Sequence, residues 1–151
     1  MDKNFEKIID KEKFQVFIMC CPAYFPFSFF RHPWFVVNKK GEISRWEIIH
    51  IKNKENNSYL YKNFQEPFKG VQVSFFIKKY WKAKPLGQVG GPIADKVIQC
   101  IENSELNYLY KDKYILTGPN SNTYAQWILN QFPEFSVKLS WRFIGKDYII
   151  N

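Results

Sequence analysis

The sequence predicts an α+β domain with a largely antiparallel sheet and two main helices. Runs of β-branched and aromatic residues dominate its first half, and a turn signature joins two of these runs. Helical periodicity is found only after Gly90-Gly91. Because strands precede helices rather than alternating with them, we expect antiparallel pairing instead of βαβ units.

The clearest strand signal is a hairpin around Asn38-Lys39-Lys40-Gly41, which has the Asn and Gly that positive-φ turn positions favour. The aromatic segment 24–30 is expected to be a loop folded over the core. Pro22 ends the first strand, and residues 58–64 are expected at a sheet edge. The predicted strands are residues 14–21, 31–37, 43–51, 58–64, 71–81 and part of 108–116.

Two helices are predicted in the second half. The first begins at Pro92 and closes near Asn103, with one apolar face formed by Ile93, Val97, Cys100 and Ile101. The second spans about 121–131, and Pro133 ends it. Its apolar face is Tyr124, Trp127 and Ile128. The tail 135–148 is expected to hold a last strand and a closing loop at Gly145.

Length and composition predict one domain over residues 1–151, with a core large enough to need neither disulfide nor metal. The formal charge of +8 has two open interpretations: attraction to nucleic acid, an anionic membrane surface or an acidic substrate, or a coding bias toward Lys. Only three Arg are present, whereas base and phosphate recognition favours Arg. We expect the coding bias to account for more of the charge.

The three cysteines, Cys20, Cys21 and Cys100, do not form a disulfide framework, so a reducing cytoplasm is the expected location. Residues 14–30 are the most hydrophobic stretch, but two prolines and a polar residue interrupt it. We therefore expect no signal peptide and no transmembrane segment. No paired-ligand spacing indicates a metal, and no cofactor is predicted.

The segment Gly118-Pro119-Asn120-Ser121-Asn122-Thr123 is the strongest candidate for a functional site. It places the Ser121 hydroxyl at a helix start, where unpaired N–H groups and the helix dipole stabilise negative charge. The alternative is helix capping, since Asn, Ser and Thr are the preferred cap residues. Both interpretations are open from this segment alone.

A serine nucleophile needs a base and a group that orients the base. His32, at the start of the first hairpin strand, is the candidate base; the alternative is a packed histidine whose ring is satisfied by a backbone carbonyl. If Lys39 and Lys40 form a two-residue loop, His32 lies opposite Glu47, and a change of one residue moves that partner to Ile48. His50 is a second candidate for the orienting role.

Two motifs resemble a bacterial domain family of unknown function, DUF3750. They are His32-Pro33-Trp34-Phe35-Val36-Val37 and Thr117-Gly118-Pro119-Asn120-Ser121-Asn122-Thr123-Tyr124, with a similar closing Gly145-Lys146-Asp147-Tyr148. More distantly, the layout is similar to circularly permuted papain-like proteins, the group of NlpC/P60 enzymes and lecithin:retinol acyltransferase. In that group a strand His precedes a Cys nucleophile that opens a helix.

This resemblance implies a permuted papain-like architecture, with Ser121 as nucleophile, His32 as base, and Glu47 or His50 as orienting group. The expected binding residues are Asn120, Asn122, Thr123 and Trp34. Serine in the cysteine position implies either a serine hydrolase or acyltransferase acting on an amide or ester, or a scaffold that has lost catalysis. In the second case the groove binds a peptide, acyl or cell-wall fragment without turning it over.

Two further segments carry weaker signals. The segment Lys78-Lys79-Tyr80-Trp81-Lys82-Ala83-Lys84 suits nucleic-acid binding by phosphate contact and base stacking, or else is a solvated strand end. Gly87-Gln88-Val89-Gly90-Gly91 suggests a phosphate loop but lacks the residues of a P-loop, so a turn into the helix is expected. The oligomeric state is not predicted.

Overall fold

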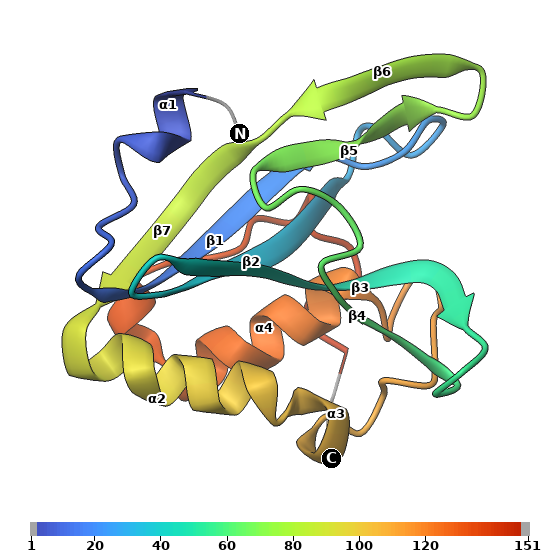
Figure 1. Cartoon of the computed structure of the whole chain (residues 1–151). Coiled ribbons are helices and arrows are strands. Elements are labelled where there is room, and N and C mark those ends of the chain that lie inside the picture. The colour runs from blue at the N-terminus through green and yellow to red at the C-terminus, as the bar shows by residue number, and fades with distance from the viewer. Residues whose placement is uncertain (1–2, 149–151) are drawn as a thin grey trace.

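The computed structural model describes residues 3–148, in which a five-stranded antiparallel sheet carries two longer helices on one face and a two-stranded ribbon on the other (Figure 1). The predicted α+β class and antiparallel pairing are confirmed. In the sheet, the order is β4-β3-β2-β1-β7, and β5 and β6 form the ribbon. The strands are β1 Phe14–Pro22, β2 Arg31–Lys39, β3 Glu42–Asn53, β4 Ser58–Lys62, β5 Lys69–Ser74, β6 Ile77–Lys82 and β7 Lys84–Gly90.

Alternation along β1 and β2 divides the interior into two cores. Ile18 and Phe35 point toward the helices and belong to the larger core. Their neighbours Phe17 and Trp34 point the other way, toward Phe68 and the strand ribbon. Both faces of the central strands are buried, which is why these segments are almost continuously apolar in sequence.

The larger core is closed by α2 (Gly91–Glu102) and α4 (Ser121–Gln131), which lie under the same sheet face (Figure 1). Pro92 lies in the first turn of α2, where a missing N–H costs nothing, and Asn103 caps its end. The shorter helices are α1 (Lys3–Glu6), α3 (Ser104–Asn107) and the 3-10 turn η1 (Pro133–Phe135).

Five predicted elements were wrong. Residues 71–81 form two strands, because the chain reverses at Phe75-Phe76. Residues 87–90, expected in a turn into the helix, belong to β7 (Lys84–Gly90), whereas residues 108–116 and 135–148 contain no strand. The loop 24–30 does not fold over the core, since Phe25, Phe27 and Phe29 are exposed.

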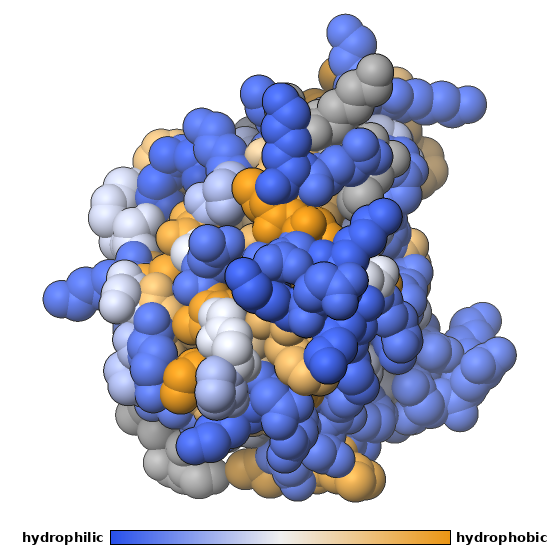
Figure 2. All heavy atoms as spheres, turned by 60° about the vertical axis from the view of Figure 1, so that its left-hand side comes forward, coloured by the Kyte–Doolittle hydropathy of each residue, from blue (hydrophilic) through white to orange (hydrophobic). Residues whose placement is uncertain are grey.

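Hydrophilic side chains cover most of the face that carries α1, β7 and the start of α2, and apolar side chains show between them (Figure 2). None of the helices within residues 3–148 combines the length and the apolar composition needed to cross a membrane.

Candidate functional site

The start of α4 is capped by Asn120 rather than by Ser121. Asn120 Oδ1 accepts hydrogen bonds from the backbone N–H groups of Asn122 (2.9 Å) and Thr123 (3.3 Å). Thr123 Oγ1 accepts one from the Asn120 N–H at 3.1 Å, which completes a reciprocal capping box. Capping therefore uses Asn120 and Thr123, and it leaves the Ser121 hydroxyl out.

The same polar residues hold the C-terminal tail. Asn120 Nδ2 and Asn122 Nδ2 both donate to the Ile144 carbonyl, at 3.0 and 2.8 Å, and Thr123 Oγ1 donates to the Gly145 carbonyl at 2.7 Å. These bonds join the start of α4 to residues 144 and 145 of the closing segment. The predicted binding residues Asn120, Asn122 and Thr123 are thus largely occupied by structural contacts.

One acceptor at the start of α4 lacks a partner. Asn122 is 3% exposed, and its Oδ1 makes no hydrogen bond to any described residue. A buried amide oxygen without a donor costs free energy, so this atom is a candidate acceptor for a ligand N–H or O–H. Ser121 lies beside it in sequence and is 4% exposed.

His32 and Glu47 form a buried pair on the ribbon side of the sheet. His32 Nε2 lies 2.8 Å from Glu47 Oε2. The observed ladder pairs Lys39 with Glu42, so the two-residue loop is Lys40-Gly41 and not the expected Lys39-Lys40. Continuing this register would place His32 opposite Ile49, which makes Glu47 a diagonal neighbour. The shift is an even number of residues, so Glu47 keeps the same face as His32.

Arg45 completes this cluster, and the sequence analysis missed it. Its Nη2 donates to Glu47 Oε2 at 2.8 Å. Its Nε lies 2.6 Å from Glu47 Oε1, close enough for an ion pair although these two atoms do not form a hydrogen bond. The guanidinium also stacks over Trp34, 4.2 Å from the ring centre, and Nη1 donates to the Glu66 carbonyl. The alternation that pointed to Glu47 would have found Arg45 as well, two residues away on the same face.

The charge of Glu47 determines which ring nitrogen of His32 donates to it. Burial alone would raise the pKa of the Glu47 carboxyl, but the hydrogen bond from His32 and the charge of Arg45 outweigh it and hold that pKa below its usual value. An ionised Glu47 accepts only, so His32 must donate from Nε2. Nδ1 is then the ring nitrogen with a free lone pair, and it is the atom that can act as a base.

The tail brings the starts of β2 and α4 close together. The Arg31 N–H donates to the Arg142 carbonyl at 3.0 Å, and Asn122 Nδ2 donates to the Ile144 carbonyl at 2.8 Å. Carbonyls two residues apart lie at most about 7 Å from each other. Ser121 and His32, the neighbours of these two donors, therefore belong to the same region of the molecule.

The described contacts join His32 to Glu47 but join neither of them to Ser121. Tyr124 of α4 packs on Phe35, with ring centres 6.0 Å apart, on the helix side of the sheet. His32 instead lies beside Trp34, also at 6.0 Å, on the ribbon side. Ser121 and His32 can therefore meet only at the end of the sheet where β2 starts, because the sheet separates the two faces elsewhere.

His50 and Trp34 have other surroundings. The ring of His50 lies 6.4 Å from those of Tyr24 and Tyr114, and burial together with the nearby His32 lowers its pKa. Glu47, and not His50, is the observed partner of His32. Trp34 is 1% exposed and donates to the Pro67 carbonyl at 2.7 Å, so it supports the cluster from inside the fold.

An open groove of about 700 Å³ begins at Thr123 and follows the outer side of α4 and the tail. Trp127, Lys138 and Tyr148 are among the residues that line it, whereas Ser121 and His32 are not. Within residues 3–148, no group of three or more His, Cys, Asp or Glu side chains is arranged to hold a metal.

The cysteines offer no ready thiolate. Cys20 and Cys21 are buried on opposite faces of β1, and burial raises the pKa of both thiols, that of Cys21 to about 12. Burial also raises the pKa of Cys100, which is partly buried on α2.

Comparison with known proteins gives one family match. Residues 13–148 match the model of a family described as "Protein of unknown function (DUF3750)". No curated protein and no solved structure matches the chain at a significant level.

Proposed function

Because the chain belongs to the DUF3750 family of proteins of unknown function, we propose its activity from its own site: acyl transfer from an ester or amide, with Ser121 as the nucleophile. His32 is the base, Glu47 orients the base, and the acyl group passes to water or to another acceptor. The proposal includes a permuted papain-like architecture, in which the strand that bears the base precedes the helix that bears the nucleophile.

The buried contact between His32 Nε2 and Glu47 Oε2 carries this proposal. It fixes the tautomer of the imidazole and leaves Nδ1 free to accept a proton. The capping box adds support, because Asn120 takes the role that would otherwise have explained Ser121. The tail contacts at Arg142 and Ile144 add a third argument, since they hold the starts of β2 and α4 near one another.

In the proposed reaction, Ser121 Oγ attacks the carbonyl carbon as its proton passes to His32 Nδ1. Asn120 already occupies the N–H groups of Asn122 and Thr123, so the Ser121 N–H is the donor left at the helix start for the oxyanion. The protonated His32 then gives its proton to the leaving group. Water, activated by the same nitrogen, attacks the acyl-enzyme and releases the acid.

A fluorophosphonate probe tests the nucleophile directly, because it bonds covalently to an activated serine. We expect one adduct on the purified protein, located on Ser121 by peptide mass spectrometry. Ser121→Ala removes the adduct, and His32→Gln slows its formation at least 100-fold, within the range assigned to general base catalysis. Ser140→Ala is the matched control, since Ser140 is exposed and lies outside the cluster. Labelling that persists in Ser121→Ala contradicts the proposal.

The groove beside α4 favours a second candidate, a binding module without catalysis. Its lining includes Trp127 and Tyr148 as apolar surfaces and Lys138 as a cation, while Lys146 is paired with Asp147 of the same lining at 2.6 Å. Such a lining suits a peptide or cell-wall fragment that carries a carboxylate. In that case no probe adduct forms, and saturable binding of a muropeptide survives Ser121→Ala but weakens in Trp127→Ala.

A further inference from the structure

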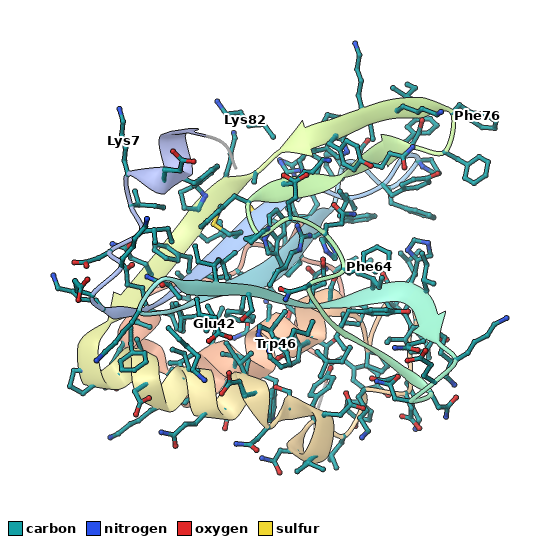
Figure 3. The ribbon with its side chains drawn as sticks, in the orientation of Figure 1. Lys7, Glu42, Trp46, Phe64, Phe76 and Lys82 are labelled. Atoms are coloured by element: carbon teal, nitrogen blue, oxygen red, sulfur yellow. The ribbon has the colours of Figure 1, made fainter. Side chains whose placement is uncertain are left out.

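The strand ribbon ends in two aromatic residues that have no cover. Ser74 pairs with Ile77, so Phe75 and Phe76 form a two-residue turn, and they are 81% and 93% exposed. A hairpin turn in water is usually built from Gly, Asn or Asp. Phe76 projects from the tip of the ribbon, away from the sheet (Figure 3). The only packing between described rings here is the contact of the two Phe with each other, at 5.8 Å.

A second group of exposed aromatics adjoins the ribbon. The Phe25 N–H donates to the Val73 carbonyl of β5 at 2.9 Å, which holds the loop 23–30 beside the ribbon (Figure 1). Phe29 of that loop lies 5.3 Å from Trp141, measured between ring centres, and its backbone carbonyl accepts a hydrogen bond from Arg142 Nε at 2.9 Å. We name this set the aromatic edge: Phe25, Phe27, Phe29, Phe75, Phe76 and Trp141, each at least 43% exposed.

The sequence stretches that form the aromatic edge carry only basic charges. Between Glu66 and Asp95 the chain has no acidic residue. The same holds between Glu12 and Glu42, the stretch that contains the loop 23–30, and from 135 to 146, which contains Trp141. Lys69 is paired with Glu66 at 3.4 Å, and the other cations of the ribbon and its continuation into β7 are Lys78, Lys79, Lys82 and Lys84. A partner for this surface must therefore be both apolar and anionic.

We propose that the aromatic edge and the ribbon lysines bind the surface of an anionic lipid membrane. Exposed Phe and Trp side chains partition into the boundary between headgroups and acyl chains, and lysines above them gain from the negative surface potential. A projecting turn suits insertion into a deformable lipid layer. The long lysine stems allow the charged groups to stay at headgroup level while the rings go deeper.

Nucleic acid fits this surface less well. Base stacking needs free aromatic faces along a cationic channel. The two aromatics that alternate with the lysines are already engaged: Lys69 lies over Tyr80, 4.0 Å from the ring centre, and Trp81 Nε1 donates to the Ala23 carbonyl at 3.2 Å. The free aromatics lie instead at the Phe75-Phe76 turn, in the loop 23–30 and at Trp141, apart from the lysine-bearing strands.

Flotation with lipid vesicles tests the inference on the full chain. The probes are vesicles of phosphatidylcholine alone and of phosphatidylcholine with 30% phosphatidylserine. We expect binding to the anionic vesicles at 50 mM NaCl, at least tenfold weaker binding to the neutral ones, and a marked loss at 500 mM NaCl. Phe75→Ser with Phe76→Ser is expected to weaken anionic binding at least tenfold, and Lys78→Gln with Lys79→Gln by a similar factor.

Leu106→Ser is the matched control, because Leu106 is 83% exposed and lies in α3, on the opposite side of the molecule from the ribbon (Figure 1). It is expected to bind as the unchanged protein does. Circular dichroism shows whether each variant is folded. Brominated lipid reports insertion independently: it should quench the tryptophan fluorescence of the unchanged protein more than that of Trp141→Phe, because the other four Trp are common to both. Binding that is unaffected by the paired Phe changes overturns the inference. So does a single-stranded oligonucleotide that binds through the lysines while the vesicles do not bind.

Discussion

Gly145 packs directly against the side chain of Asn120, so closely that a Cβ on Gly145 would lie 2.6 Å from Asn120 Nδ2. The φ angle of Gly145 is +86°, a region that other residues rarely adopt. The closing turn of the chain and the cap of α4 are therefore parts of one structure. The tail between them also carries the two carbonyls that hold the starts of β2 and α4.

Gly145→Ala should destabilise the protein by about 2–3 kcal/mol, the sum of backbone strain and displacement of the Asn120 side chain. Gly41→Ala is the matched control. Its φ is +95°, but the nearest atoms to its Cβ belong to Lys11 at 3.7 Å, so only strain applies. Urea unfolding should give a loss of about 1 kcal/mol for Gly41→Ala. Equal losses in the two variants would show that the contact with Asn120 is unimportant.

Asn120 serves α4 through its oxygen and the tail through its nitrogen, and two substitutions separate these roles. Asn120→Asp keeps the acceptor for the N–H groups of Asn122 and Thr123 but turns a carboxylate oxygen toward the Leu116 and Ile144 carbonyls. Asn120→Ala removes both roles and should cost at least the ~1 kcal/mol of a lost cap. We expect Asp to be no better than Ala in thermal unfolding, because it places a negative charge against buried acceptors. Full stability in Asn120→Asp would show that the tail contacts contribute little.

Glu47→Gln should destabilise the protein at pH 7 by about 3 kcal/mol, since it leaves Arg45 buried without its counter-ion. The pKa of Glu47 is lower in the folded state than in the unfolded chain. Its contribution to stability is therefore complete above the ordinary glutamate value of about 4.3 and is lost as the pH falls through the folded value.

Urea unfolding between pH 7 and pH 3 measures this contribution. The unchanged protein should lose more stability over the acidic part of the range than Glu47→Gln does, so the two curves should converge. The remaining carboxylates are common to both proteins and cancel in the comparison. Parallel curves would mean that the contacts with Arg45 and His32 do not lower the pKa of the Glu47 carboxyl.

Local signals were sufficient for much of the fold. The turn at residues 38–41, the paired Pro92 and Asn103, and the stop at Pro133 each act on their own neighbours, and the hairpin and both long helices were predicted from them. The reversal at Phe75-Phe76 was missed because it contains none of the residues that usually make turns. If the aromatic edge binds lipid, that missing signal has a functional cause.

The missed strand β7 has a long-range cause. Gly87 argues against a strand in sequence, but a Cβ there would lie 2.4 Å from Val137 Cγ2, so the tail requires glycine at this position. For residues 108–116 the error was the opposite one: a strand was predicted, and none forms. Their aromatic content suggested a strand, whereas Tyr108 packs from a loop against Tyr124 and Trp127 of α4.

In the candidate site, too, local patterns predicted some features, and others depend on contacts between residues distant in sequence. Alternation along a hairpin was enough to put Glu47 on the face of His32, although the loop was assigned one residue too early. The position of Ser121 relative to that face depends on the tail at 142–145, which no local pattern reveals. The role of Asn122 as a tail anchor with a free oxygen is likewise visible only in three dimensions.

The cysteines give a last prediction, which separates Ser121 from any thiol as the reactive group. Cys20 and Cys21 are buried in the two cores, and burial raises the pKa of both thiols, so they should react with a thiol reagent only when the protein unfolds. Cys100 is partly exposed on α2 and should account for the one faster reaction at pH 7.5. Cys100→Ser should abolish that phase in a colorimetric thiol assay, whereas all three thiols should react in 6 M guanidinium.

Alkylated protein should still form the fluorophosphonate adduct on Ser121 at its normal rate, because no thiol takes part in the proposed reaction. Loss of that adduct after alkylation of Cys100 alone would contradict the assignment of Ser121 as an independent nucleophile.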